Sequence, residues 1–340
     1  MCFGKGSEVT ACRICGNLEG NTPYIARELH LGLGEEFEYF ECALCGCLQI
    51  HEIPLDLSKY YPDNYYSYEP AAPTVEFSRQ GLGGYKQRLV LSLLTKYYFG
   101  NKSALGNWLA KRSALSRDYP LWVRQQRLDL KLNARSSILD VGCGKGRALL
   151  DLRAYGFTDL IGIDPFLEAD VFYDNGVKVY KKSVDELDQQ FDFIMLHHSF
   201  EHMPDQLPTL AKLRDLLKPN GYLLLRVPVV NSYQWRKYGL HWAGLDAPRH
   251  LYLHTRKSLE CLAGQAGFRI AEVVFDSDGF TDWASKQYLA GISLLDPRSY
   301  GISPSASIFS PEDIEDFAAQ AAELNAKGEA DCAGFYLRHE

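Results

Sequence analysis

The segment from Ile138 to Gly146 constrains the fold of this chain more than any other. An apolar run from Ile138 to Val141 leads directly into glycines at positions 142, 144 and 146. Glycine adopts positive φ angles and leaves room for a ligand to approach the backbone, where a side chain would collide with it. The apolar spacing of residues 148–155 then predicts a helix that ends at Gly156. The segment therefore predicts a strand, a ligand-binding loop and a helix in succession.

Two acidic residues accompany this loop. Asp140 lies two residues before the first glycine, and Asp164, about 20 residues past that glycine, ends the next predicted strand, where a ribose-binding carboxylate is expected. The dinucleotide fingerprint requires a third glycine at the position of Arg147, so a nicotinamide dehydrogenase is excluded. S-adenosylmethionine has no pyrophosphate to place on a helix N-terminus, and its sulfonium and ammonium groups are favoured by a carboxylate such as Asp140. The loop and its acids therefore favour a cationic nucleoside.

The pattern Asp140-x-Gly142-x-Gly144-x-Gly146, followed by Asp164, resembles the class I S-adenosylmethionine-dependent methyltransferases. The resemblance covers residues 118–338 and implies an α/β fold with a Rossmann-like, seven-stranded sheet, mostly parallel with an antiparallel last strand. The predicted strands are residues 138–141, 160–163, 177–180, 191–196, 222–227, 268–275 and 332–338. The implied contacts with the cofactor S-adenosylmethionine are Asp140, Gly142, Gly144, Gly146, Asp164, Val184, Asp185 and His198.

The fourth predicted strand ends in a run of polar residues, 197–205. Ligands of open α/β sheets bind at the carboxyl edge of the strands, so this run should lie close to the transferred methyl group. A hydroxyl acceptor must lose its proton, and imidazole titrates near neutrality. His202, with Glu201 beside it, is therefore our first candidate for the general base, and His250 is the second. An equally weighted alternative is that His202 only holds its loop by hydrogen bonds.

A second polar and aromatic cluster follows the fifth predicted strand. His241, Trp242 and Arg249 belong to it, and we interpret it as a cap over the acceptor site. Arg249 has the geometry to bind a phosphate or carboxylate in bidentate fashion. The alternative is a polar network that pins the cap to the sheet.

Two Cys-x-x-Cys pairs stand near the N-terminus. Cys12 and Cys15 are separated from Cys42 and Cys45 by 26 residues, and such paired motifs predict a tetrahedral, structural zinc site. Redox pairs or disulfides are the alternatives. The sequence thus predicts a zinc-ribbon module, a linker with a basic amphipathic helix, and a methyltransferase domain with one insertion. Their predicted bounds are residues 1–58, 59–117, 118–340 and, for the insertion, 279–328.

A zinc module followed by a class I domain resembles the deoxysugar methyltransferases and related enzymes of polysaccharide and secondary-metabolite biosynthesis. The matching pieces are Cys12-Arg13-Ile14-Cys15-Gly16 and residues 40–46. This resemblance implies methyl transfer to a small polar metabolite such as a sugar or nucleotide-sugar. A zinc-containing RNA methyltransferase and a non-catalytic adaptor, with a relic Rossmann-like domain, are the other functions that this domain order allows.

Charge bears on the choice of partners. The net charge is −7, yet residues 79–131 hold 11 Lys or Arg and only two acids. A nucleic-acid partner would require a basic surface beyond this linker, so none is expected. The basic helix predicted over residues 85–99 either contacts an anionic membrane surface or bridges the domains, and bridging is favoured. No apolar run is long enough for a membrane span and no signal peptide is evident, so we expect a cytoplasmic protein; its oligomeric state is open.

Overall fold

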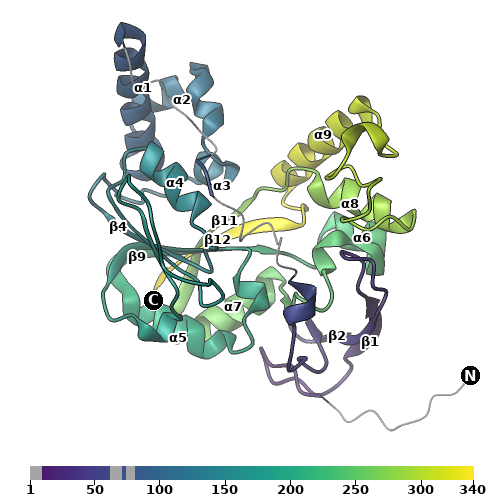
Figure 1. Ribbon diagram of the computed structural model, residues 1–340. Helices are drawn as coiled ribbons and strands as arrows, with labels where there is room; N and C mark the ends of the chain where they lie inside the picture. The colour runs from purple at the N-terminus through teal and green to yellow at the C-terminus, as the bar shows by residue number, and fades with distance from the viewer. Residues whose placement is uncertain (1–9, 62–70, 74–80) are drawn as a thin grey trace, which may run out of the picture.

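The computed structural model describes residues 10–61, 71–73 and 81–340, and it is built around one large twisted sheet (Figure 1). Residues 62–70 and 74–80 of the predicted linker lie outside the described residues. The strands of the sheet in chain order are β4 (Ser137–Val141), β5 (Asp159–Ile163), β6 (Val171–Phe172), β7 (Lys178–Tyr180), β8 (Phe191–His197), β9 (Leu217–Pro228), β11 (Phe268–Phe275) and β12 (Cys332–His339). Their order in space is β11-β12-β9-β8-β4-β5-β7-β6.

The predicted α/β architecture is confirmed, and two of its details are corrected. β4 pairs in parallel with β5 and β8, and β12 runs antiparallel between β9 and β11, as expected of the last strand. The described sheet has eight strands instead of seven, because the two-residue β6 pairs antiparallel with β7 at one edge. β9 also begins at Leu217, five residues before the strand predicted at residues 222–227, since Leu217 already pairs with Phe191. Neither feature has a periodic pattern that a sequence would reveal.

Alternate residues of the central strands face two different cores. Ile138 and Leu224 belong to one apolar cluster, whereas their neighbours Leu139 and Leu225 belong to the other. Because a strand places successive side chains on opposite faces, continuously apolar strands must be covered on both sides. The first core includes α1 (Gly81–Phe99), α3 (Leu121–Gln125) and α4 (Arg147–Ala154), and the second includes α5 (Gln206–Leu216) and α7 (Arg256–Gln265). The sheet is thereby buried between two helical layers.

Several helix boundaries follow the capping signals of the sequence. Thr255 caps α7 through a capping box with Ser258. Within the predicted insertion, Ser310 and Asp313 form the same motif at the start of α9 (Pro311–Lys327), whose end is marked by Gly328 in the left-handed region. The other α-helices within the described residues are α2 (Ala104–Arg112), α6 (Tyr233–Tyr238) and α8 (Phe280–Leu289). Figure 1 shows α1 and α2 projecting together from the body, on the side opposite α8 and α9.

The N-terminal module shares its sheet with the large domain. β1 (Thr22–Arg27), β2 (Glu36–Glu41) and β3 (Leu48–Ile50) form an antiparallel sheet whose fourth strand is β10 (Tyr252–Leu253). One apolar cluster includes Tyr39 and Leu48 of the module together with Leu225 and Leu253 of the large domain. The module and the α/β domain are therefore packed as one body.

No helix within the described residues is long and apolar enough to cross a membrane. The basic helix predicted over residues 85–99 is present as α1, which begins four residues earlier than expected. Leu91 and Leu94 of α1 are buried against the sheet layer, whereas Tyr85 and Leu89 are exposed. A membrane contact by this helix stays a prediction.

The shared core leads to a first prediction. Leu253 is completely buried in β10, so Leu253→Ala should lower the free energy of unfolding by about 2–5 kcal/mol through lost burial and a residual cavity. Because the core is continuous, urea unfolding should remain a single transition by both tryptophan fluorescence and far-UV circular dichroism. Leu55→Ala, at a fully exposed position, is the control and should change stability by less than about 0.5 kcal/mol. Separate transitions for the module and the domain would contradict a shared core.

Candidate functional site

The glycine loop follows β4 with all three glycines at positive φ. Gly142, Gly144 and Gly146 have φ values of 71°, 51° and 82°. A Cβ at Gly142 would lie 2.5 Å from the Cβ of Ser199, and one at Gly146 would lie 2.8 Å from a methyl group of Val179. Both distances are shorter than side chains tolerate, and the backbone conformation itself favours glycine. The sequence Gly-x-Gly-x-Gly is thus required by the local structure.

The two predicted acids lie beneath this loop. The Asp164 carboxylate accepts hydrogen bonds from the backbone N–H groups of Gly144 and Phe166, both at 2.9 Å, which shapes the loop. Asp140 is buried, and its Oδ1 has no hydrogen-bond partner among the described residues. Burial, reinforced by the charge of Asp164, raises the pKa of Asp140 to about 8. An unsatisfied buried carboxyl oxygen beside an open glycine loop is a position that a cationic or hydrogen-bond-donating ligand would satisfy.

The other predicted cofactor residues lie at the same edge of the sheet. Val184 and Asp185 belong to η4 (Val184–Glu186), which follows β7, and His198 follows β8 with a positive φ of 50°. β5, β7 and β8 lie in the parallel part of the sheet, so the segments that follow them reach one edge. Val184 is half-buried and Asp185 is exposed. The structure therefore brings the predicted residues to one edge, and their contacts with a cofactor stay a prediction.

The predicted catalytic residues form a buried cluster in η5 (Phe200–His202) and the segment after η7 (Ala243–Leu245). Glu201 is fully buried, and its Oε1 lies 3.3 Å from Nδ1 of His198 and 3.9 Å from Nε2 of His250. Neither oxygen accepts a hydrogen bond of ordinary geometry from the described residues. Burial raises the pKa of Glu201, but the contact with His198 and the charges of the neighbouring histidines outweigh it and lower this pKa to about 2. A carboxylate is thus held ionised in the interior.

The ring of His202 is oriented by its Nδ1. This atom lies 2.9 Å from the backbone oxygen of Arg249 and 3.1 Å from the hydroxyl of Tyr61. A carbonyl oxygen only accepts hydrogen bonds, so Nδ1 carries the proton and Nε2 keeps a lone pair. Burial, assisted by the charge of His250, lowers the pKa of His202 to about 4, so the ring is neutral at pH 7. A neutral imidazole with a free lone pair has the properties of a general base.

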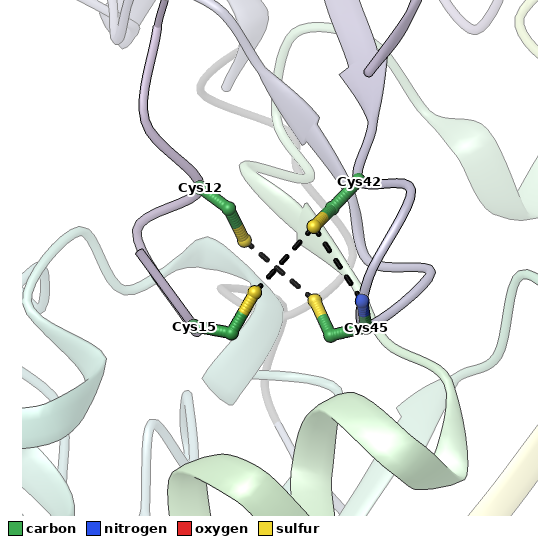
Figure 2. A group of neighbouring side chains, drawn as sticks. All are labelled: Cys12, Cys15, Cys42 and Cys45. Atoms are coloured by element: carbon green, nitrogen blue, oxygen red, sulfur yellow. Dashed lines mark hydrogen bonds between the residues drawn. The ribbon is translucent and has the colours of Figure 1, made fainter. Parts of the chain in front are cut away.

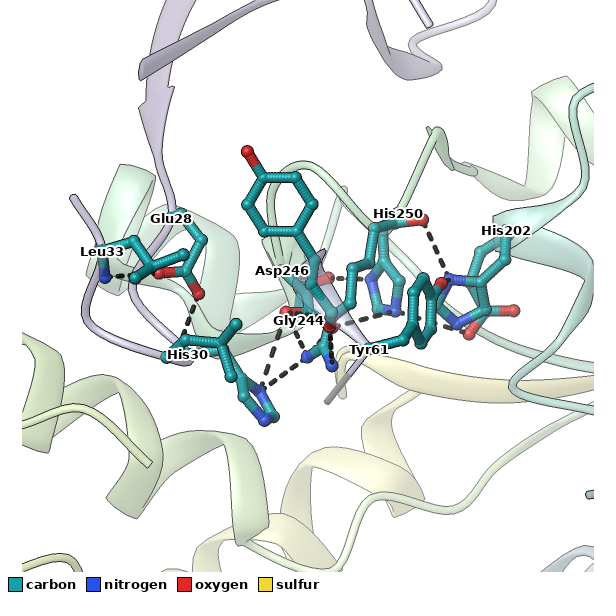
Figure 3. Close-up of polar contacts among 12 residues, drawn as sticks. Glu28, His30, Leu33, Tyr61, His202, Gly244, Asp246 and His250 are labelled. Carbon is teal, nitrogen blue, oxygen red and sulfur yellow. Dashed lines mark hydrogen bonds and ion pairs between the residues drawn. The ribbon is translucent and has the colours of Figure 1, made fainter. Parts of the chain in front are cut away.

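His250 is fixed in a similar way. Its Nδ1 donates to the backbone oxygen of Gly244 at 2.8 Å, and its Nε2 lies 3.6 Å from Asp246 Oδ2. Asp246 in turn accepts two hydrogen bonds of 2.7 Å from Arg249, whose guanidinium also lies 2.7 Å from Nδ1 of His30. Figure 3 shows His30, Asp246, His250 and His202 as a row of side chains drawn from both the N-terminal module and the large domain. One ligand atom each of Glu201, His202 and His250 lies within 4.8 Å of the others.

The three predicted acceptor contacts are placed very differently. His241 is exposed at the end of η6 (Gly239–His241). Trp242 is 1% exposed and donates from its indole nitrogen to Asp331 at 2.7 Å, while Arg249 is 3% exposed and paired with Asp246. The contacts of Trp242 and Arg249 in this structure are thus those of the alternative interpretation, a polar network that holds the cap to the sheet. Their contact with an acceptor stays a prediction.

Sequence reasoning missed His30 as a member of this cluster. It lies in the loop between β1 and β2, and the buried carboxylate of Glu28 accepts hydrogen bonds from Leu31 N at 2.6 Å and Leu33 N at 2.8 Å in the same loop. Burial lowers the pKa of His30 to about 4. No pattern in a linear sequence relates residue 30 to residue 249, so only the tertiary structure reveals the contact.

The four predicted cysteine ligands converge at the edge of the N-terminal sheet. Their sulfur atoms all lie within 4.8 Å of one another, with Sγ–Sγ distances of 3.6 Å for Cys12–Cys45 and 3.5 Å for Cys15–Cys42 (Figure 2). A tetrahedron of thiolates around zinc at about 2.3 Å requires sulfur separations of about 3.8 Å. The four sulfurs therefore have the spacing that a zinc ion needs.

The two cysteine pairs have the same backbone structure. Cys12 N donates to Asn17 O at 2.9 Å and Gly16 N donates to Cys12 O at 2.8 Å; Cys42 N and Gly46 N make the corresponding bonds, to Cys47 O and Cys42 O, at 3.0 and 2.8 Å. Gly16 and Gly46 have nearly equal φ values of 74° and 73°. Each pair thus forms the same tight turn. Cys47, two residues after Cys45, is fully buried and is not a member of the group of four sulfurs.

Three comparisons with known proteins find methyltransferases among the proteins similar to this chain. The family model described as a methyltransferase domain matches residues 115–273, so this part of the chain is similar to domains of methyltransferase type. Over 121 residues the chain is 26% identical to a demethylmenaquinone methyltransferase of Staphylococcus saprophyticus. That match covers 30% of this chain and 49% of the relative, so the chain spans about half the length of the curated relative it matches.

Solved structures with a similar fold are distant in sequence. A cyclopropane synthase of Mycobacterium tuberculosis shares 17% identity, with 61% of this chain and 79% of that one covered and a TM-score of 0.39. A SAM-dependent methyltransferase of Archaeoglobus fulgidus shares 17% identity, with coverages of 73% and 98% and a TM-score of 0.38. A Haemonchus contortus phosphoethanolamine N-methyltransferase, solved with S-adenosylhomocysteine, shares 16% identity, with coverages of 79% and 61% and a TM-score of 0.39. Alignments this loose transfer no acceptor to the present chain.

The raised pKa of Asp140 leads to a second prediction. The fold favours the neutral carboxyl, so Asp140 contributes stability below pH 4 that is lost as the pH rises to about 8. Asp140→Asn is neutral at every pH and should match the parent at pH 4, yet be more stable by roughly 5 kcal/mol at pH 8, because one pKa unit corresponds to about 1.4 kcal/mol. Urea denaturation at pH 4, 6 and 8 measures this, with the exposed Asp188→Asn as control. A constant difference across this range would show that Asp140 is not held neutral.

Proposed function

We propose that this protein is an S-adenosylmethionine-dependent methyltransferase that acts on a small polar metabolite, of the sugar or nucleotide-sugar type, and that carries one structural zinc ion. The observation that carries the proposal is the position of Ser199. Its hydroxyl donates to the backbone oxygen of Val141 at 2.8 Å, directly before the glycine loop, and it lies two residues before Glu201. The loop that would hold a cationic donor and the cluster that would take a proton are thus joined by one side-chain contact.

The donor would lie over the glycine loop. Asp140 offers an unsatisfied carboxyl oxygen to the positively charged part of the cofactor, and Asp164 lies where ribose hydroxyls are expected. Val184 and Asp185 would flank the adenine, and His198 would lie close to the methyl group. The cofactor itself supplies an electrophilic methyl group, so the protein must orient the acceptor and remove its proton.

His202 is the preferred general base of this proposal. Its Nδ1–H is held by a backbone carbonyl, which leaves the Nε2 lone pair available to accept a proton from an acceptor hydroxyl. Glu201, ionised and buried beside it, would stabilise the imidazolium that forms. The Nε2 of His250 instead faces the carboxylates of Asp246 and Glu201, so His250 is the second choice.

The polar acceptor follows from the character of the cluster. Imidazoles, carboxylates and the Tyr61 hydroxyl surround the proposed base, and such groups favour an acceptor that hydrogen-bonds. The more specific sugar assignment is supported by the order of the parts, a paired-cysteine module followed by a methyltransferase-type domain. The acceptor named for the curated relative does not extend to this chain, because that match covers only 30% of it.

The assay of this proposal uses methyl-labelled S-adenosylmethionine with a panel of nucleotide-sugars and polar metabolites, read by mass spectrometry. His202→Gln should reduce kcat by about 10²–10⁴-fold, the usual contribution of a general base, with little change in cofactor affinity measured by calorimetry. His339→Gln is a matched control, because His339 lies on β12 and contacts Leu217 O. Absence of S-adenosylmethionine binding by the parent protein would overturn the proposal, and full activity of His202→Gln would transfer the role of base to His250.

The zinc assignment has its own prediction. Elemental analysis of the purified chain should find one zinc ion per protein, and Cys42→Ser should lose it because three thiolates bind more weakly than four. Cys261→Ser is the control, since Cys261 lies outside the sulfur cluster. A zinc-free parent chain whose four cysteines are found as disulfides by mass spectrometry would contradict the assignment.

A further inference from the structure

The paired cysteines and the histidine cluster are connected through one short strand. β3 of the N-terminal module pairs antiparallel with β10, which begins two residues after His250. We propose that the metal-loaded cysteine cluster positions the acceptor side of the active site, and that Gln49 and Tyr39 are the positioning residues that connect the two. The inference rests on the proposed function, because it assigns the cysteine cluster a role in the same reaction.

The first connection runs from a cysteine sulfur to β3. Gln49 is completely buried, and its Nε2 donates to the sulfur of Cys12 at 3.1 Å. Its Oε1 accepts from the backbone N–H of Arg13 at 3.0 Å. The side-chain amide of Gln49 therefore makes hydrogen bonds to both a sulfur atom and a backbone N–H group of the first cysteine turn. A thiolate bound to zinc accepts such a bond more strongly than a neutral thiol, because its charge strengthens it.

The second connection runs from β3 and β2 to His250. Gln49 and Leu48 pair with Tyr252 and Leu253, and Ile50 N donates to Leu251 O at 3.0 Å. From β2, the buried hydroxyl of Tyr39 donates to the backbone oxygen of His250 at 2.8 Å. Each of the four consecutive residues 250–253 is thus contacted by the N-terminal module through its backbone.

The second cysteine turn contacts the helix that follows β10. The hydroxyl of Thr255 donates to Cys45 O at 2.6 Å, and a Cβ at Gly46 would lie 2.9 Å from the Thr255 methyl group. Gln265, at the end of α7, donates to Ile14 O at 2.8 Å in the first turn. Both cysteine turns therefore contact the segment that begins at β10. The second turn contacts Thr255, the N-cap of α7, and the first turn contacts Gln265, the last residue of α7.

The same segment holds the proposed base from its other side. Leu251 N donates to Glu201 O at 2.9 Å, and Arg249 O accepts from Nδ1 of His202 at 2.9 Å. A shift of residues 249–251 would therefore change both the orientation and the tautomer of His202. β4 and β5, which carry the glycine loop and Asp164, belong to the other sheet and pair with β7 and β8. The cysteine cluster is thus attached to the acceptor side, whereas the strands of the donor side pair elsewhere.

Hydrogen exchange of the full, zinc-loaded chain tests this connection without any acceptor. Tyr39→Phe removes the bond to His250 O, and we expect the amides of residues 249–253 to exchange about five- to ten-fold faster while those of residues 138–163 change by less than about two-fold. Removal of zinc by a chelator should have the same selective effect, with an unchanged calorimetric affinity for S-adenosylmethionine. Tyr24→Phe is the matched control, because it removes a tyrosine hydroxyl bond to Glu41 in the same module, away from β10.

In a methylation assay the positioning role should appear as a change in kcat and in the acceptor KM, with the cofactor KM unchanged. Equal exchange in both segments, no change in residues 249–253, or the same effect from Tyr24→Phe would overturn the inference. The proposed function fails separately, if the zinc-loaded parent binds no S-adenosylmethionine or methylates no acceptor while the selective exchange is observed. Undiminished transfer by a verified zinc-free chain would overturn the positioning role alone.

Discussion

The parallel pairing of β4 with β5 and β8 is the constraint on which the other features depend. Parallel strands end at one edge, so the glycine loop, Asp164 and the η5 turn are brought together although up to about 60 residues separate them in the sequence. The same pairing buries the strands on both faces, which explains why alternate residues belong to different cores. The topology of the sheet therefore determines which residues of the site lie close together.

The second half of the site depends on a much smaller element. β10 is only two residues long, yet it completes the N-terminal sheet, follows His250 and precedes the cap of α7. A two-residue strand has little stability of its own. Its position is instead fixed by the bonds of His250 O and Leu251 N before it, and by the bond from Thr255 to the second cysteine turn after it. The acceptor side thus depends on tertiary contacts, whereas the glycine loop and Asp164 of the donor side come from one short stretch of the chain.

That difference explains what the sequence could and could not predict. The glycine loop, Asp140 and Asp164 were predictable because local backbone requirements fix residue types at fixed spacings. The paired cysteines were predictable for the same reason, and their convergence in space is confirmed. β6, β10 and the contact of His30 with Arg249 had no local signal, since two-residue strands lack periodicity and a contact across 219 residues depends on the whole fold.

Burial explains why the histidine cluster contains so many charged partners. Removing the Glu201 carboxylate from water is expensive unless neighbouring groups compensate, and three histidines from two segments surround it. Asp246 is compensated in a different way, by hydrogen bonds from both Nη2 and Nε of Arg249. Each of these side chains is in turn held by a hydrogen-bond partner. Arg249 contacts His30, His202 bonds to the backbone oxygen of Arg249, and His250 bonds to the backbone oxygen of Gly244. Because every member is held by another, a displacement of the segment 249–251 would leave charges unpaired in the interior. The network therefore favours a single geometry for the proposed base, and the N-terminal module, through Tyr39 and β3, contacts the segment on which that geometry depends.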